Sequence, residues 1–123
     1  MNTARRIFLI AGIYGLAVIV PPYFLEGRIA REHSPAITHP EHYYGFLGVT
    51  LAWQIAYLVI ASDPLRYRPL MLVGVLAKWS FAAAVAVLWW QQRVSGPVLG
   101  FATVDFVFGL LFLAAFRRVG RIV

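Results

Sequence analysis

The chain has 123 residues, 61% of them hydrophobic and 13% charged, with a formal net charge of +6. Soluble domains carry about 25% charged residues, so this composition excludes an ordinary soluble domain and is typical of a membrane protein. The chain has no cysteine, which excludes disulfide exchange, thiol catalysis and Cys-ligated metal centres. The basic residues gather at the ends of apolar stretches, so we expect membrane lipids rather than nucleic acid as their partner.

Four apolar stretches are each long enough to cross a bilayer once as a helix: residues 7–25, 44–61, 70–90 and 98–116. A helix rises about 1.5 Å per residue and the hydrocarbon core is about 30 Å thick, so little chain is left for anything else. We therefore predict an all-α fold, a four-helix transmembrane bundle in a single domain over residues 1–123. We expect a multi-pass protein of the bacterial inner (plasma) membrane.

The first stretch follows Arg5 and Arg6 and ends at Pro21 and Pro22. Its basic start resembles a signal peptide, and residues 5–9 match a twin-arginine export pattern. No small-residue cleavage site follows, so we expect a retained helix whose last turn is kinked or ended by the two prolines.

The arginines are distributed unequally between the two ends of the predicted bundle. One end holds Arg5, Arg6, Arg66, Arg68, Arg117, Arg118 and Arg121, and the other holds Arg28, Arg31 and Arg93. Because loops rich in basic residues stay inside, this seven-to-three ratio predicts that both termini are cytoplasmic. Short connections at 62–69 and 91–97 predict that the second helix neighbours the third, and the third the fourth, in antiparallel order.

Residues 26–42 form the predicted outer segment, which contains all three histidines: His33, His39 and His42. The side chains of His39, Glu41 and His42 offer imidazole and carboxylate ligands of the kind that transition metals bind. Pro40 argues against both histidines facing the same way on a regular helix, so we predict no metal site. We expect a solvated, partly helical interfacial segment, or a lid over a cavity between the helices.

Lys78 and Asp105 lie well inside the third and fourth stretches, where a charge costs at least about 2.5–3.5 kcal/mol. The helical rise places Lys78 about 12 Å and Asp105 about 16 Å from the cytoplasmic edge. Gln54 lies at about the same depth and Tyr14 about one turn away. We therefore predict one polar layer to which all four helices contribute: Tyr14, Gln54, Lys78 and Asp105.

Three interpretations of this layer are open from the sequence. Lys78 and Asp105 form a neutralising salt bridge that fixes the helix register, or Lys78 extends to the cytoplasmic side and never meets Asp105. In the third interpretation the layer is a polar pocket for a substrate headgroup, or a proton-titrating site. Direct pairing has one argument against it, because Cβ atoms tilt toward each helix N-terminus and the two side chains start out leaning apart.

Small residues recur at spacings of four or eight positions, which lets helix backbones approach closely in a membrane. These residues are Ala11, Gly15, Gly48, Ala52, Ala56, Gly74, Ala82 and Ala86. We expect them to serve packing within the chain, with a homo-oligomer or a larger membrane complex as the alternative.

Several short motifs resemble a group of small, uncharacterised bacterial four-helix membrane proteins. They are His-Pro-Glu-His-Tyr-Tyr-Gly-Phe at 39–46, Trp53-Gln54, and Asp-Pro-Leu-Arg-Tyr-Arg-Pro-Leu-Met at 63–71, and the likeness covers most of residues 37–116. The chain is also similar to the DoxX-like proteins in size and helix count, without a specific motif of theirs. Neither resemblance implies an activity or a functional residue.

The sequence contains no recognisable nucleophile–base pair and no phosphate-binding loop. We therefore expect a non-enzymatic protein without a cofactor: an accessory subunit, or a module that binds lipids or small hydrophobic molecules. One alternative is a small transporter or channel that uses the polar layer. A second is a membrane enzyme with His39, Glu41 and His42 at its outer face.

Overall fold

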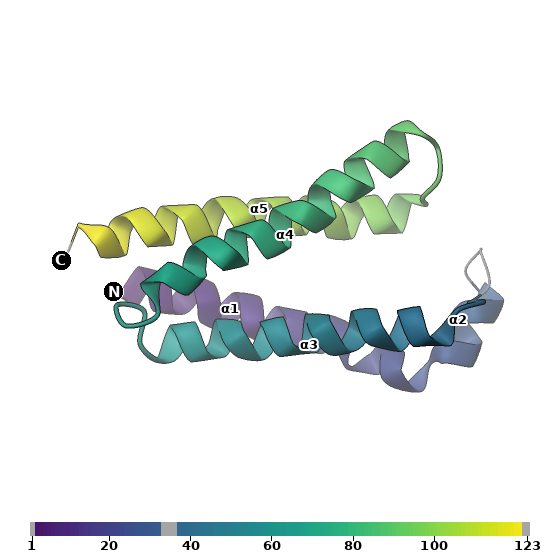
Figure 1. The fold of residues 1–123 in the computed structure, drawn as a ribbon, viewed down its shortest axis with the longest axis horizontal. Coiled ribbons are helices and arrows are strands. Elements are labelled where there is room, and N and C mark those ends of the chain that lie inside the picture. Colours follow the sequence, from purple (N-terminus) through teal and green to yellow (C-terminus); the bar gives the residue numbers. More distant parts are fainter. Residues whose placement is uncertain (1, 33–36, 122–123) are drawn as a thin grey trace.

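The computed structural model describes residues 2–32 and 37–121, and over these residues it consists of helices and turns without a strand (Figure 1). The elements are α1 (Asn2–Ile19), a 3₁₀ helix η1 (Pro21–Phe24), α2 (Glu26–Glu32), α3 (Pro40–Ser62), α4 (Arg68–Trp90) and α5 (Gly96–Gly120). α1 with η1, α3, α4 and α5 are each long and apolar enough to cross a membrane. The described chain confirms the predicted all-α fold with four long apolar helices.

All four long helices begin earlier than the apolar stretches from which they were predicted. Three of them have a proline in the first turn: Pro40, Pro69 and Pro97. Proline is tolerated there because the first N–H groups of a helix have no intrahelical partner. α1 begins ahead of its two arginines for a different reason, since arginine is a good helix former. Apolarity alone therefore misplaces the helix starts.

The two prolines after α1 end that helix, as the sequence predicted. α1 stops at Ile19 and the chain continues as η1, because Pro21 and Pro22 have no N–H to donate to the helix. The Tyr43 hydroxyl donates a hydrogen bond to the Pro22 carbonyl, which fixes this bend against the start of α3.

Segment 26–42 is partly helical, as expected, but its boundary with the second long helix differs from the prediction. Its first seven residues form α2, and α3 begins within the segment, at Pro40. The Tyr44 hydroxyl donates a hydrogen bond of 3.3 Å to Glu26, so α2 is attached to the first turns of α3. His33 lies outside the described residues.

The four long helices form two antiparallel pairs, α1 with α3 and α4 with α5 (Figure 1). The pairs touch mainly through α1 and α5. They lie close together at the end that carries both termini and the turn between α3 and α4, which we call the terminal end. At the opposite end, which carries α2 and the turn between α4 and α5, the pairs diverge, and we call it the splayed end.

The short turn between α3 and α4 does not make these two helices close neighbours, contrary to the prediction from its length. α3 and α4 share few contacts, whereas α4 and α5 pack closely, as predicted. α4 diverges from α3 beyond the turn, and α1 becomes the packing partner of α3 instead (Figure 1). This divergence leaves room between the two helix pairs.

The closely packed core lies at the terminal end of the bundle. Each long helix contributes a large, fully buried side chain to it: Phe8, Tyr57, Met71 and Phe112. The Phe8 and Phe112 rings stack with centroids 4.2 Å apart, and the Tyr57 and Phe112 centroids lie 4.9 Å apart. These contacts join the two helix pairs and close the bundle at this end.

Two arginines at the terminal end bind carbonyl groups near helix C-termini. Arg5 Nε donates a hydrogen bond of 3.1 Å to the Ala61 carbonyl of α3, and Arg68 Nε donates one of 2.9 Å to the Phe116 carbonyl of α5. A cation is favourable near the C-terminus of a helix because the helix dipole is negative there. Both arginines therefore stabilise the fold in addition to carrying charge.

α4 and α5 approach each other closely where Trp79 crosses Gly109. The Trp79 indole N–H donates a hydrogen bond of 3.2 Å to the Phe106 carbonyl of α5. A Cβ at position 109 would overlap the indole ring, so the absence of a side chain there permits this contact.

We expect Gly109→Ala to destabilise the protein by about 1–3 kcal/mol, because the indole ring must move and weaken its hydrogen bond. The control is Gly100→Ala in the same helix, where an added Cβ meets nothing within 4 Å. Thermal unfolding in detergent, followed by circular dichroism, separates the two variants. Equal melting temperatures for both would contradict the close contact.

Candidate ligand-binding site

A cavity of about 760 Å³ lies between the two helix pairs. It extends from the splayed end, where Pro22 and Tyr43 line it, to Lys78 and Asp105. Its volume is within the range of pockets that hold small molecules, about 300–1,000 Å³. Every long helix contributes side chains to it, so the cavity depends on the way the whole bundle is assembled.

The walls of the cavity are mostly aliphatic and aromatic. They include Val18, Ile19, Leu47, Trp53, Phe81 and Val98. Three further wall residues remain largely exposed, namely Phe46 (53%) and Val49 (65%) of α3 and Phe101 (47%) of α5. Because these wall residues are themselves exposed, the cavity is open to the outside of the bundle.

Lys78 and Asp105 form an ion pair at the inner end of the cavity. Lys78 Nζ donates a hydrogen bond of 3.2 Å to Asp105 Oδ1, which joins α4 to α5. The Lys78 side chain is 7% exposed and the Asp105 side chain 21%. The lysine side chain is therefore long enough to reach Asp105 although the two Cβ atoms tilt in opposite directions. The interpretation in which Lys78 extends to the cytoplasmic side and never meets Asp105 is wrong.

Two aromatic rings cover the Lys78 ammonium on its other sides. Nζ lies 5.3 Å from the centroid of the Tyr57 ring of α3 and 5.4 Å from that of the Phe108 ring of α5. A cation is attracted to an aromatic face, so these rings add to the stabilisation that Asp105 provides. The ammonium thus has partners from two helices besides its own.

Gln54 lines the same cavity, but it does not bond to the ion pair. Its Nε2 donates a hydrogen bond of 2.9 Å to the Thr50 carbonyl one turn earlier in α3. Its Oε1 is buried, accepts no hydrogen bond from the described residues, and lies against Gly15 of α1. A Cβ at position 15 would overlap this amide, so the glycine lets Gln54 lie flat between α1 and α3.

Tyr14 also lines the cavity, and it completes the set predicted from the sequence. Its ring packs against Phe108 with centroids 5.6 Å apart. Its hydroxyl forms no hydrogen bond with the described residues. The four members of the predicted layer therefore meet at one cavity, but only Lys78 and Asp105 bond to each other.

The wall residues and the two rings around Lys78 were not predicted as parts of a site. One signal was available on α3, where Thr50, Trp53, Gln54 and Tyr57 follow helical spacing and all line the cavity. The contributions of Phe101 and Phe108 depend on how α5 is placed against the other pair, which no local pattern specifies.

The segment between the first two long helices contributes to the cavity at the splayed end. Ile29 of α2 and Tyr43 of α3 are among its lining residues. The hydrogen bonds from Tyr43 to Pro22 and from Tyr44 to Glu26 hold this part of the lining in place. The structure thus places part of the predicted outer segment beside the cavity, as the lid interpretation requires.

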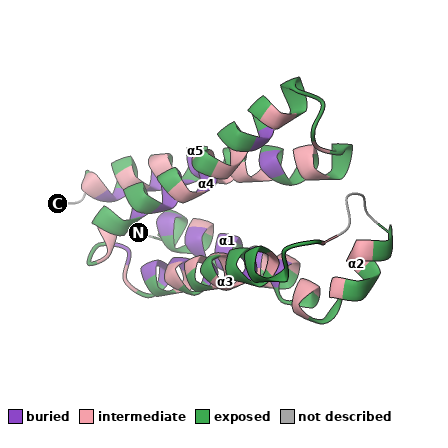
Figure 2. Cartoon of the chain, turned by 45° about the vertical axis from the view of Figure 1, so that its right-hand side comes forward, coloured by how far each residue is buried: buried purple, intermediate pink, exposed green. Residues whose placement is uncertain are grey.

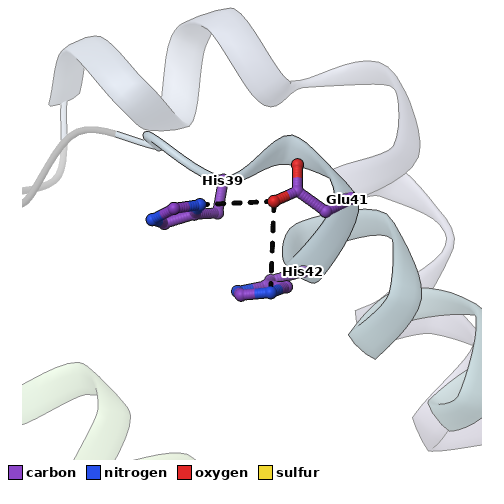
Figure 3. A group of neighbouring side chains, drawn as sticks. All are labelled: His39, Glu41 and His42. Atoms are coloured by element: carbon purple, nitrogen blue, oxygen red, sulfur yellow. Dashed lines mark hydrogen bonds and ion pairs between the residues drawn. The ribbon is translucent and has the colours of Figure 1, made fainter.

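His39, Glu41 and His42 gather at the start of α3 (Figure 3). One ligand atom from each lies within 4.8 Å of the others, and His39 Nδ1 is 3.2 Å from Glu41 Oε1. The argument from Pro40 is wrong for a geometric reason. His39 precedes the helix as its N-cap and His42 is in the first turn, so the proline between them keeps both rings on one side.

This cluster is separate from the cavity, since none of its residues lines it, and all three side chains are exposed. Among the described residues no fourth histidine, cysteine, aspartate or glutamate joins the cluster. Metal sites depend on surrounding contacts that hold the ligands in place, and side chains that are 66–78% exposed lack most of them. We still predict that the cluster holds no metal. The reason is now the exposure of its three side chains and no longer the position of Pro40.

No protein-family model matches the chain, and neither a curated protein nor a solved structure matches it. The resemblance to small bacterial four-helix membrane proteins and to DoxX-like proteins therefore stays a prediction. Function has to be argued from the cavity and its side chains.

Removing one member of the ion pair leaves the other charge unpaired in an apolar cavity. We expect Lys78→Met and Asp105→Leu each to lower stability by about 3 kcal/mol, and the double variant to be more stable than either. Thermal unfolding in detergent measures this, and Thr103→Val, at an exposed position of the same helix as Asp105, is the control. A double variant as unstable as the worse single one would show that pairing does not hold these residues.

Proposed function

We propose that this protein is a multi-pass membrane protein that binds a small hydrophobic or amphiphilic molecule in the cavity between its helix pairs. The observation that carries the proposal is the lining of the cavity, which combines exposed apolar walls with a single ion pair. Binding sites of this type hold an apolar body by its surface and use a few polar groups to orient it.

Membrane insertion is supported by the outer surface of the four long helices. Only 22–28% of the most hydrophobic window of each helix is buried inside the bundle. Figure 2 shows exposed segments along all four helices, and large apolar side chains such as Leu76 (67%) and Trp90 (87%) are among them. Monomeric soluble proteins rarely expose contiguous apolar surface of this extent, whereas a bilayer covers it.

The orientation with both termini in the cytoplasm is supported by the arginines. Seven of them belong to the segments at the terminal end and three to those at the splayed end. This charge difference favours the terminal end on the cytoplasmic side of the membrane, and we propose the bacterial inner membrane as its location.

Single cysteines test this orientation, because the chain has none of its own. We expect a membrane-impermeant maleimide to label Ser95→Cys, at the splayed end, in intact cells. Ser62→Cys, at the terminal end, should react only after the membrane is permeabilised. Both serines are exposed in the fold, so their intrinsic accessibility is matched. The reverse pattern would overturn the orientation, and equal labelling of both in intact cells would contradict insertion.

Transport is the second candidate function, and the Lys78–Asp105 pair inside a cavity favours it. A path through the bundle would have to continue from the pair to the terminal end. There Phe8, Phe112 and Met71 are fully buried, and the first two stack on each other. A binding site that is closed at one end accounts for these contacts directly, so we rank transport below binding. An enzyme that uses the His39–Glu41–His42 cluster ranks third, because that cluster does not line the cavity.

The binding proposal is tested with a long-chain alcohol that carries a photoreactive diazirine, applied to the protein in phosphatidylcholine vesicles. We expect saturable labelling of cavity residues such as Trp53 and Phe81, competed by unlabelled dodecanol and mapped by mass spectrometry. Ala77→Phe places a ring in the cavity and should abolish the competed labelling. Ala84→Phe is exposed on the same helix, does not line the cavity, and should retain it.

Ser80→Leu provides a second way to fill the cavity, in case Ala77→Phe fails to fold. Ser80 lines the cavity and is exposed, so a larger side chain there disturbs the packing of the bundle less. Labelling confined to the exposed helix faces, without competition by dodecanol, would overturn the proposed function. Such labelling would report only partition of the probe into the bilayer.

A further inference from the structure

We propose that the ligand of this cavity is a neutral amphiphile whose polar group donates a hydrogen bond to the Asp105 carboxylate. This inference rests on the proposed function and names the chemical class that the site selects. Hydroxyl and amide N–H groups on an apolar body belong to that class. The argument depends on which atom of each polar side chain is open to the cavity.

The second oxygen of Asp105 is the acceptor that the cavity offers. Oδ1 accepts the hydrogen bond from Lys78, whereas Oδ2 accepts none from the described residues. The buried side-chain atoms without a partner in the described chain consist of Gln54 Oε1 alone, so Oδ2 is accessible. Since Asp105 lines the cavity and its side chain is 21% exposed, Oδ2 is the atom that we assign to the ligand.

The other charged group is less open to the cavity. The Lys78 side chain is only 7% exposed, its ammonium donates to Asp105, and the centroids of the Tyr57 and Phe108 rings lie 5.3 and 5.4 Å from it. The Asp105 side chain, at 21%, is therefore the more open of the two charged groups. A ligand group that only accepts hydrogen bonds meets a charged donor that is nearly buried and already bound to Asp105.

The Gln54 side chain does not add a free hydrogen-bonding group beside the ion pair. Its Nε2 is occupied by the Thr50 carbonyl, and its Oε1 is directed at Gly15 of α1. Tyr14 is the remaining polar residue of the predicted layer, and its hydroxyl forms no hydrogen bond with the described residues. The Tyr14 hydroxyl is therefore a second group in the cavity that a ligand hydroxyl can bind, since a hydroxyl both donates and accepts.

The net charge of the site favours a neutral ligand. Lys78 and Asp105 cancel each other at 3.2 Å, so a third charge inside the cavity would have no counter-charge of its own. Burial of an unpaired charge in apolar surroundings is costly. An ammonium would also be repelled by Lys78, and a carboxylate by Asp105. A neutral donor avoids both penalties and still gains a charge-assisted hydrogen bond.

The test compares competitors that share one dodecyl chain and differ in the polar group, against the photoreactive alcohol probe in phosphatidylcholine vesicles. Dodecanol should compete at a concentration roughly tenfold or more below that of dodecyl methyl ether, which accepts hydrogen bonds but cannot donate them. Dodecylammonium and dodecanoate should both compete less well than dodecanol, after correction for their measured partition into the vesicles.

The Lys78→Met/Asp105→Leu double variant removes the acceptor without leaving a buried charge. In this variant dodecanol and its methyl ether should compete equally. The control is Thr103→Val, which removes a hydroxyl from α5 at a position that does not line this cavity, and it should keep the preference for the alcohol.

Equal competition by the alcohol and the ether in the wild-type protein would overturn the inference while leaving the binding function in place. Stronger competition by dodecylammonium than by dodecanol would overturn it as well, because the site would then select a cation. If no competitor displaces the probe from the wild-type protein, the proposed binding function itself fails.

Discussion

The Lys78–Asp105 ion pair is the interaction on which the interior of this bundle depends. An ammonium among apolar helices needs a counter-charge, and Asp105 of α5 supplies it at 3.2 Å. The pair joins α4 to α5. The Tyr57 ring of α3, 5.3 Å from the ammonium, then bridges the two helix pairs at the same level. Lys78 and Asp105 are thereby held at the inner end of the cavity. The apolar walls alone would not orient a ligand.

The two ends of the bundle are packed in different ways, and the cavity follows from this difference. At the terminal end, Phe8 and Phe112 stack between the pairs, and Arg5 and Arg68 hold helix carbonyls. Toward the splayed end the aromatic wall residues are packed less closely: the Phe46 ring of α3 and the Phe81 ring of α4 have centroids 6.4 Å apart, and Phe46 remains 53% exposed. The compact end supplies stability, so the other end can remain open.

Much of the fold, and the composition of the polar layer, could be predicted from the sequence. Apolar length is a local property and indicated four long helices, and helical rise placed Lys78 and Asp105 at compatible depths. The pairing of α4 with α5 was predicted, but the pairing of α3 with α1 instead of α4 could not be, because the short turn before α4 constrains only the ends that it connects. The direction of the Gln54 side chain could not be predicted either, since it depends on Gly15 of another helix. The His39–His42 contact was misjudged because Pro40 was taken as interior to the helix.

The chemistry of the cavity is set by which polar atoms face it, more than by which polar residues line it. Gln54 and Lys78 are polar, yet one is directed at neighbouring backbone and the other is covered by an anion and two rings. Asp105 is the more exposed of the two charged side chains, at 21% against 7% for Lys78. Phe46 and Val49 of the cavity wall are exposed and apolar, so a ligand meets apolar side chains where the cavity opens. If these side chains lie in a bilayer, as we propose, the ligand comes from a region that excludes charged molecules, and a neutral molecule that donates to Asp105 is suited to an ion pair without net charge.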